Sequence, residues 1–255
     1  MTNNDAIELT KKGKLQVVEN EVAGVVWQTG ISGSEIWMGD LNVEPNIKTE
    51  PLHHGASETV HYVLKGAVTI HYGDKFSTRE KLEEGDFIYI PPYRAYTVNN
   101  EDTANGVRIV TFMASEFVVN YINETEIVAI PEEFLEDDFE IKRGQDLDAG
   151  TDQTKNMPRK TGIQSSKIWI GRVTGEPAKD SGAHHHGKAE TGGFIISGVT
   201  RLLHGENYKE YVELTEGDFL RVPPFLPHIE RNMSDTETVE FLTARNPRNI
   251  VVNLD

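Results

Sequence analysis

Short runs of β-branched and aromatic residues recur along the chain, and each run ends near a glycine, an aspartate or a proline pair. Runs of this length and composition, closed by turn-forming residues, are typical of β-strands. The clearest of them cover residues 59–64, 68–72, 87–90, 193–197, 199–204 and 219–222. No segment has the length and the 3.6-residue period of a substantial helix, and the best helical candidate is the acidic stretch 131–135. The pattern therefore predicts an all-β protein.

The two halves of the chain repeat one another at a fixed offset of 132 residues. Between positions 34–100 and positions 166–232, 21 of 67 residues are identical, and the alignment needs no gap. Unrelated segments share far fewer identities, so the repeat indicates a duplicated structural unit. We expect two domains, one over residues 1–125 and the other over residues 126–255.

Composition and charge exclude several classes of function. The chain has 25 Lys and Arg against 41 Asp and Glu, a formal net charge of −16, which repels nucleic acids and anionic membranes. No stretch approaches the ~20 apolar residues of a membrane helix. Cysteine is absent, which excludes disulfides, thiolate metal ligands and thiol nucleophiles. Because no basic and apolar leader follows Met1, we expect a cytoplasmic protein without a membrane or nucleic-acid partner.

Three histidines and a glutamate in the second half have the spacing of a metal site. His184 and His186 lie two residues apart in an extended segment, so their side chains face the same way. Glu190 follows after a short bend, and His228 lies where a returning strand can bring it alongside. Three imidazoles and one carboxylate suit a divalent ion such as Fe(II), Mn(II), Ni(II) or Zn(II). A solvated polar loop is the alternative for the histidines, but the positions of Glu190 and His228 argue against it.

These residues resemble the two sequence motifs of the cupin superfamily, and the resemblance covers both halves from about residue 29 onward. The first motif has two histidines, a glutamate and a glycine, and the second has a glycine, a proline, a histidine and an asparagine. In chain order they are His184, His186, Glu190 and Gly198, then Gly217, Pro223, His228 and Asn232. The resemblance implies two tandem barrels of the jelly-roll type. It also implies that the three histidines and Glu190 hold one divalent metal ion per chain.

The sequence departs from the pattern of the superfamily at three positions. Gly198 comes one residue later than the usual spacing, and Ala178 and Phe225 stand where turn glycines are usual. Because these departures concern turns rather than ligands, we expect the metal site of the second half to be intact.

The first half retains only part of this set of residues. The equivalent positions are Leu52, His54, Glu58 and Tyr96. Leucine cannot bind a metal, and a tyrosine would have to lose a proton with a pKa near ~10. The first half is either an altered second site, which uses His53 or His54 with Glu58 and Tyr96, or a domain that only stabilises the other. We favour the second interpretation, and we expect the isolated strand histidines His61, His71 and His204 to lie at the surface.

The resemblance is compatible with several reactions, and we predict an Fe(II)-dependent dioxygenase that combines a small chelating enol, diketone or phenol with dioxygen. Glu190 and Glu230 are the predicted catalytic residues, because Glu230 lies two positions after His228 and shares its face in a regular strand. Neighbouring apolar side chains are expected to line a cavity that excludes water. They are Phe194, Ile196, Phe225 and Leu226.

Two other functions stay open from the sequence. The first is a non-redox, metal-dependent isomerase or decarboxylase, and the second is a cupin that binds a ligand without catalysis. The metal would separate the first from the dioxygenase, since a redox-active ion is needed for reaction with dioxygen. We also expect a homodimer, because twofold homo-oligomers are the commonest assemblies of soluble proteins.

Overall fold

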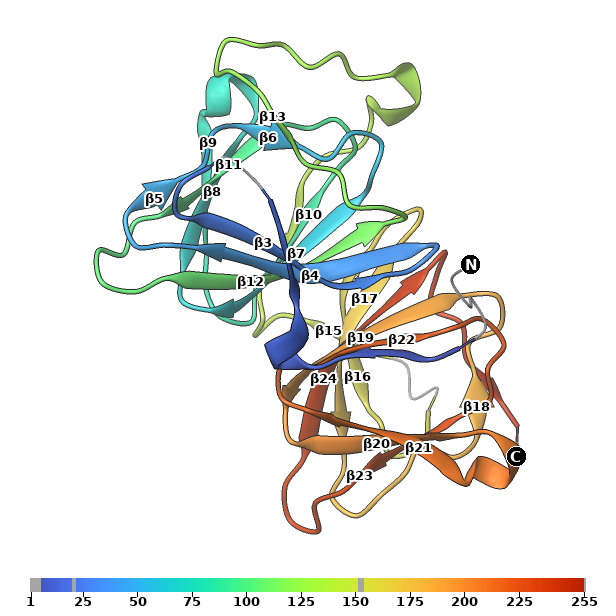
Figure 1. The fold of residues 1–255 in the computed structure, drawn as a ribbon. Helices are drawn as coiled ribbons and strands as arrows, with labels where there is room; N and C mark the ends of the chain where they lie inside the picture. Colours follow the sequence, from blue (N-terminus) through green and yellow to red (C-terminus); the bar gives the residue numbers. More distant parts are fainter. Residues whose placement is uncertain (1–5, 20–21, 151–153, 255) are drawn as a thin grey trace. The chain divides into compact units, whose positions relative to one another are not determined.

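The structure, a computed structural model, describes residues 6–19, 22–150 and 154–254, and strands dominate it (Figure 1). The chain divides into two compact units. The N-terminal unit consists of residues 16–32 and 37–146, and the C-terminal unit consists of residues 6–15, 33–36 and 147–254. Each unit contains one copy of the repeat, so the predicted all-β protein with two tandem barrels is confirmed.

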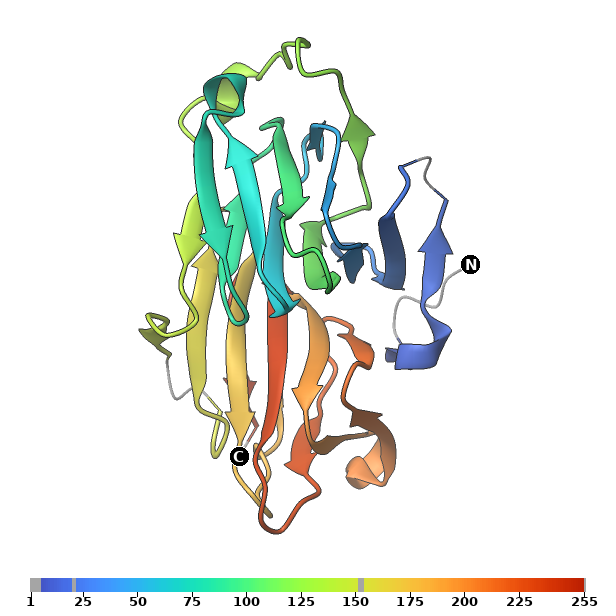
Figure 2. The ribbon, with the colours of Figure 1, turned by 90° about the vertical axis from the view of Figure 1, so that its left-hand side faces the viewer.

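The N-terminal unit contains two antiparallel sheets, whose long strands are visible in Figure 2. Its strands are β2 (Gln16–Val18), β3 (Val25–Ser32), β4 (Ile36–Val43), β5 (Ile47–Lys48), β6 (Leu52–His53), β7 (Thr59–Lys65), β8 (Val68–Tyr72), β9 (Thr78–Leu82), β10 (Phe87–Ile90), β11 (Tyr96–Asn100), β12 (Val107–Ala114), β13 (Asn120–Tyr121) and β14 (Glu140–Lys142). The larger sheet has the order β14-β10-β7-β12-β4-β3-β2. The smaller sheet has the order β13-β6-β11-β8-β9, and β5 pairs with β11. Branched and aromatic side chains such as Trp27, Val63 and Ile88 form its core.

The C-terminal unit repeats this arrangement. Its strands are β1 (Glu8–Thr10), β15 (Asp148–Ala149), β16 (Arg159–Gln164), β17 (Trp169–Gly175), β18 (His184–His185), β19 (Glu190–Ser197), β20 (Val199–His204), β21 (Glu210–Thr215), β22 (Phe219–Val222), β23 (Ile229–Asn232), β24 (Val239–Asn246) and β25 (Val252–Asn253). The main sheet has the order β1-β22-β19-β24-β17-β16-β15. Opposite it lie the sheet β21-β20-β23 and the pair β18-β25. Strands equivalent by the repeat therefore occupy equivalent places in the two units.

The helical content is limited to single 3-10 turns in the described residues. These turns are η1 (Lys12–Lys14), η2 (Asp74–Phe76), η3 (Glu132–Phe134) and η4 (Glu206–Tyr208). The acidic segment 131–135 forms only η3. Within the ranges described above, no helix has the length and hydrophobicity needed to cross a membrane.

Each unit gains an additional strand at one edge of its main sheet. Strand β1 pairs with β22 in the C-terminal unit, and the Lys11 ammonium lies 2.8 Å from the Asp218 carboxylate beside it. Strand β14 pairs with β10 in the N-terminal unit. A covered edge no longer offers free backbone groups for pairing with another chain. As a result, residues 126–146 lie with the first copy of the repeat and residues 6–15 with the second, which differs from the predicted boundaries.

The turns that replace two usual glycines keep the glycine-like backbone. Ala178 has φ of 55° and Phe225 has φ of 60°, both in the left-handed region that non-glycine residues rarely occupy. Their counterparts in the first copy, Asn46 and Tyr93, have φ of 57° and 61°. The backbone of these turns is therefore preserved in both units.

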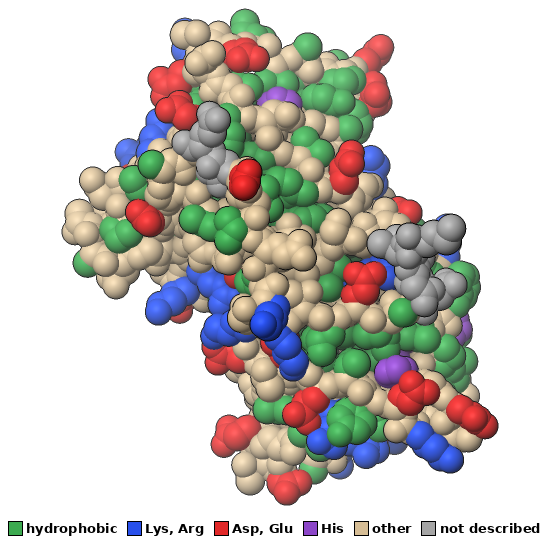
Figure 3. All heavy atoms as spheres, in the orientation of Figure 1, with side chains coloured by type: hydrophobic (Ala, Val, Ile, Leu, Met, Phe, Trp, Pro, Cys, Tyr) green, Lys and Arg blue, Asp and Glu red, His purple; other side chains and the backbone are tan. Residues whose placement is uncertain are grey.

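Charged side chains are interspersed on the surface. On the face shown in Figure 3, lysines and arginines form small groups among aspartates and glutamates. This face offers no extended basic surface, in agreement with the excess of acidic residues in the sequence.

Candidate metal centre

Four side chains with metal-binding atoms converge inside the C-terminal unit. His184, His186, His228 and Glu230 each offer one ligand atom, and these atoms all lie within 4.8 Å of one another. The backbone fixes two of the residues directly, since His184 and His228 exchange N–H to carbonyl hydrogen bonds of 3.0 and 2.9 Å. The three histidines are almost completely buried. The group therefore combines three imidazoles and one carboxylate, the donor set expected from the sequence, although with a different glutamate.

Hydrogen bonds orient all three imidazole rings. The Nδ1 atom of His184 donates to the carbonyl of Gly182 at 3.1 Å, and that of His228 donates to the carbonyl of Leu226 at 2.9 Å. The Nδ1 atom of His186 lies 2.6 Å from the Thr191 hydroxyl. With the protons on Nδ1, the Nε2 lone pairs are left for the centre of the group. Partners of this kind fix the ring orientation and the tautomer of histidine ligands in metal sites.

Two of the ligand atoms lack any hydrogen-bond partner. The Nε2 atoms of His184 and His228 are buried and unpaired among the residues that the structure describes. Buried polar atoms without partners are rare, because each one loses its hydration. Burial lowers the pKa of His184, although the nearby Glu230 charge opposes this, and burial lowers the pKa of His186 well below its usual value. Imidazole Nε2 atoms that converge on one point in this way fit a divalent cation.

Glu230 supplies the carboxylate of the group. Its two oxygens lie 3.4 Å from His184 Nε2 and 3.7 Å from His228 Nε2, and its side chain is 18% exposed. Burial by itself would raise the pKa of Glu230, but the interactions with His184 and His228 and the charge of Arg245 lower it overall. The carboxyl group is therefore ionised and lies close to the imidazoles. Glu230 faces the same side of β23 as His228, which is the position predicted from its spacing of two.

Glu190 lies away from this group, which corrects its assignment as a metal ligand. Its carboxylate accepts hydrogen bonds from the amides of Glu35 and Ile36, each at 3.0 Å, and from the Ser34 hydroxyl at 2.9 Å. The Arg221 Nε atom donates to it at 2.8 Å. Burial would raise the pKa of Glu190, but these hydrogen bonds and the Arg221 charge lower it. Glu190 therefore stabilises the fold in the described structure instead of facing the histidines, so no catalytic role follows from its position.

The displacement of Glu190 has a simple cause in strand geometry. Successive residues of a strand point to opposite faces, so a shift of one position moves a side chain to the other face. In β19, Thr191 points inward and touches His186, whereas Glu190 points outward. The late position of Gly198 indicates this shift in the sequence. In the motif, six residues separate the glutamate from the glycine, and counted back from Gly198 this spacing leads to Thr191 rather than to Glu190.

The same one-residue shift changes the predicted lining of the cavity. The interior holds a cavity of about 30 Å³ beside Glu230. Its other lining residues are Thr191, Gly193, Ile195, Thr200, Leu202, Leu214, Leu220, Val222, Phe241 and Thr243. None of the four predicted lining residues is among them. Phe194 packs against Phe219 on the other face of the sheet, and Phe225 is 62% exposed.

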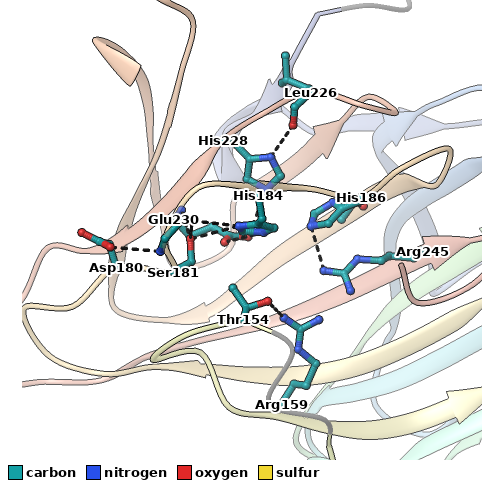
Figure 4. A network of polar contacts seen from close by, with 12 residues as sticks. Thr154, Arg159, Asp180, Ser181, His184, His186, Leu226, His228, Glu230 and Arg245 are labelled. Atoms are coloured by element: carbon teal, nitrogen blue, oxygen red, sulfur yellow. Dashed lines mark hydrogen bonds and ion pairs between the residues drawn. The ribbon is translucent and has the colours of Figure 1, made fainter. Parts of the chain in front are cut away.

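Two buried arginines, not predicted from the sequence, lie beside the histidines. Figure 4 shows the guanidinium groups of Arg159 and Arg245 on the same side of the cluster. The Nη2 atom of Arg245 donates to Nε2 of His186 at 3.1 Å. Burial and the charge of Arg159 lower the pKa of Arg245 to about 9. The sequence contains a sign of this position, because Arg245 follows Phe241 and Thr243 at a spacing of two in β24, and alternate residues of a strand face the same side.

The N-terminal unit has a hydrogen-bonded polar core at the equivalent place. The Tyr96 hydroxyl lies 2.7 Å from Nε2 of His54 and 2.7 Å from Nε2 of His61. Burial raises the pKa of Tyr96 well above its usual value and lowers the pKa of His54 to about 4. His61 is 1% exposed, which corrects its predicted surface position.

These groups satisfy one another as neutral hydrogen-bond partners. Leu52 is fully buried at the position of His184, and Glu58 is buried as well. Within the described residues, the four side chains of the C-terminal unit are the one cluster with metal-binding geometry.

Comparisons with known proteins agree with this architecture. The profile of a family described as "Cupin domain" matches residues 39–113 and residues 171–245. A search of curated protein sequences finds no match. Several solved structures share the fold over nearly the whole chain.

Oxalate decarboxylases are among these similar structures. The enzyme from Bacillus subtilis at pH 4.6 is 14% identical, with a TM-score of 0.73 over 99% of this chain and 81% of that chain. Another structure of the Bacillus subtilis enzyme, studied for its Mn(II) centres, is 14% identical, with a TM-score of 0.72 over 96% of this chain and 79% of that chain. The formate complex of the Lactobacillus farciminis enzyme is 13% identical, with a TM-score of 0.73 over 96% of this chain and 88% of that chain. At these identities the comparison shows a shared fold.

Proposed function

Because the chain belongs to the cupin family and carries two tandem cupin domains, we propose that its C-terminal domain is a metal-dependent decarboxylase of a small carboxylic acid. The observation that carries the proposal is the convergence of three oriented imidazoles and Glu230, with buried Nε2 atoms that have no partner in the described structure. A bound cation would accept the lone pairs of these Nε2 atoms, whereas apolar neighbours would leave them without a partner.

Mn(II) is the favoured ion. Three imidazoles and one carboxylate suit Mn(II), Fe(II), Ni(II) and Zn(II), and the donor set alone does not separate them. The Mn(II) centres of the Bacillus subtilis oxalate decarboxylase, which shares the fold, support manganese over the iron predicted from the sequence. His184, His186, His228 and Glu230 would hold it.

The size and charge of the interior favour a small anion as substrate. A cavity of about 30 Å³ has room for one or two water molecules, which is far less than a phenol or a flavonoid needs. Two arginines and the cation together outweigh the single negative charge of Glu230. A short carboxylate therefore fits this site better than the enols, diketones and phenols of the dioxygenase hypothesis.

The residues of the site divide the chemistry between them. When bound, the cation would act as a Lewis acid that withdraws electron density from the substrate carboxylate. Loss of carbon dioxide leaves an electron pair on carbon, and this carbon then takes up a proton. Glu230 is the only ionisable group in the described lining of the cavity. Because its carboxyl group is ionised, we assign to it the transfer of the proton that the substrate acid brings: Glu230 takes this proton up as the acid binds and returns it to the carbon. The apolar remainder of the lining keeps water from the reacting carbon.

Gas exchange separates the proposal from its alternatives. Protein loaded with Mn(II) or Fe(II) is incubated with oxalate, malonate and a panel of diketones and phenols, while carbon dioxide and dissolved oxygen are recorded together. A decarboxylase releases carbon dioxide from an acid without net consumption of oxygen. Consumption of one oxygen molecule per product would replace the proposal with the dioxygenase. Absence of turnover on the whole panel by fully loaded protein would leave a ligand-binding cupin.

A further inference from the structure

The two arginines beside the histidine cluster are buried and close to one another. Arg159 is 5% exposed and Arg245 is 2% exposed. The Nη1 atom of each donates to the same acceptor, the side-chain oxygen of Asn249, and the Arg159 contact measures 3.4 Å. The other terminal nitrogen of Arg159 donates to the Thr154 hydroxyl. Two guanidinium groups thus share one neutral oxygen in the interior of the unit.

The charge of this pair is only partly offset by the described residues, since the single carboxylate of Glu230 acts on both guanidinium groups. No described carboxylate forms an ion pair with either guanidinium, and the Nε atom of each has no hydrogen-bond partner there. Buried charges are stable in proteins when they are paired and hydrogen-bonded, and an isolated one is expensive. In a chain with a net charge of −16, two adjacent buried cations that no carboxylate contacts directly, and that share the charge of Glu230 with the metal-binding group, mark a place for an anion.

Metal binding would release a further hydrogen-bond donor. The lone pair on His186 Nε2 now accepts from Arg245 at 3.1 Å, while Nδ1 of the same ring contacts Thr191. One lone pair cannot serve a cation and a guanidinium at the same time. With the cation bound, the Nη2 group of Arg245 therefore needs another acceptor.

Comparison of the two copies of the repeat indicates that the fold does not require these residues. The positions equivalent to Arg159, Arg245 and Asn249 in the first copy are Trp27, Met113 and Phe117. Those three residues belong to the apolar core, and the rings of Trp27 and Phe117 lie 5.6 Å apart. The unit that lacks the metal-binding group also lacks the arginines.

We propose that Arg159 and Arg245 form a carboxylate-binding subsite beside the metal centre, and that Asn249 occupies it through its side-chain oxygen in the absence of an anion. A carboxylate offers two oxygens to the two guanidinium groups, and such charge-assisted pairs are stronger than hydrogen bonds to a neutral amide. That the bound carboxylate belongs to the substrate rests on the proposed function.

Formate is a suitable probe, because it is the smallest molecule that carries a carboxylate. Its dissociation constant is measured by titration calorimetry on the full chain, both stripped of metal with a chelator and loaded with Mn(II). The variants are R245M and R159M, of which the first copies the residue of the other unit, and R245K, which keeps the charge but loses the planar fork. R201M is the matched control, since Arg201 pairs with Glu213 at the surface.

We expect formate to bind the Mn(II)-loaded protein more tightly than the stripped protein. R245M and R159M should weaken binding to the loaded protein at least about tenfold, with R245K intermediate and R201M within twofold of the wild type. Thermal melts establish that each variant is folded, and R245K tests the proposal by itself if the methionine variants do not fold.

Metal content, measured on the same samples, separates the two proposals. Formate binding that is unchanged in R245M and R159M, with Mn(II) retained, overturns the carboxylate subsite and leaves the metal centre. A wild type that takes up no metal overturns the proposed function, whereas formate binding that still depends on both arginines supports the subsite.

Discussion

Substitutions of Glu190, at the start of β19, and of Glu230, in β23, should affect different properties: the first stability and the second metal binding. We predict that Glu190→Gln destabilises the C-terminal unit but leaves its metal content unchanged. We predict the opposite for Glu230→Gln, which should lose metal affinity with little change in stability. The sequence pointed to both residues as site carboxylates, and only their contacts distinguish them.

The magnitudes follow from those contacts. Glu190 is fully buried and pairs with Arg221, whose other carboxylate partner, Glu8, is partly exposed. Removal of one member of a buried ion pair typically costs about 3–5 kcal/mol, and the retained amide oxygen of glutamine places this change near the lower end. For a chain of this size, ~3 kcal/mol corresponds to a fall in melting temperature of roughly 10 °C. Glu230 makes only longer contacts, at 3.4 Å to His184 and 3.7 Å to His228, so its replacement by glutamine should cost less stability in metal-free protein than that of Glu190.

Melting temperature and Mn(II) affinity are measured on the same two variants. Melts are recorded in chelator so that bound metal does not contribute to stability. Glu230→Gln should weaken Mn(II) binding by at least the roughly 10–100-fold that loss of an outer hydrogen-bond partner costs in metal sites. Loss of metal in Glu190→Gln together with full retention in Glu230→Gln would refute the geometry described above.

Four further predictions concern the fold and the N-terminal unit. Burial lowers the pKa of His54 to about 4 in the folded protein, whereas the unfolded chain keeps the usual value of 6.5. Protonation below pH 6.5 therefore favours the unfolded state, and denaturant titrations should show full stability above pH 6.5 and a loss of about 3 kcal/mol by pH 4. Tyr96→Phe should cost about 1–3 kcal/mol, since it leaves two buried imidazoles unpaired, and metal analysis should show no change. Gly33→Ala would place a Cβ atom 2.1 Å from a Glu190 oxygen, so a lowered melting temperature is expected. Phe225→Gly relieves a left-handed backbone and should raise the melting temperature slightly, by less than about 1 kcal/mol in stability.

The sequence was sufficient for the fold because the repeat and the strand pattern support one another. Two copies of the same alternating runs, closed at matching turns, define the strands of each unit closely. The edge strands β1 and β14 were missed, since each is only three residues long and pairs with a strand far away in the sequence. Pairing over such distances leaves no local pattern.

The site was predicted in part for a similar reason. The spacing of two gives His184 and His186 a common face, and the antiparallel bridge between His184 and His228 brings the third ring to them. Glu190 was assigned to the wrong face, since the bend before β19 hides the register by one residue. The pairing of Arg159 with Arg245 depends on which strands neighbour one another in the sheet, and no spacing within one motif contains that information.

The metal stoichiometry of the full chain tests the central claim most directly. Protein stripped with a chelator is reconstituted with Mn(II), dialysed and analysed for manganese per chain, as wild type, His186→Ala and His185→Ala. His185 is the matched control, because it lies next to the ligand but outside the cluster. The account predicts one equivalent in the wild type and in His185→Ala, and close to none in His186→Ala. Two equivalents in the wild type, or undiminished manganese in a folded His186→Ala variant, would contradict it.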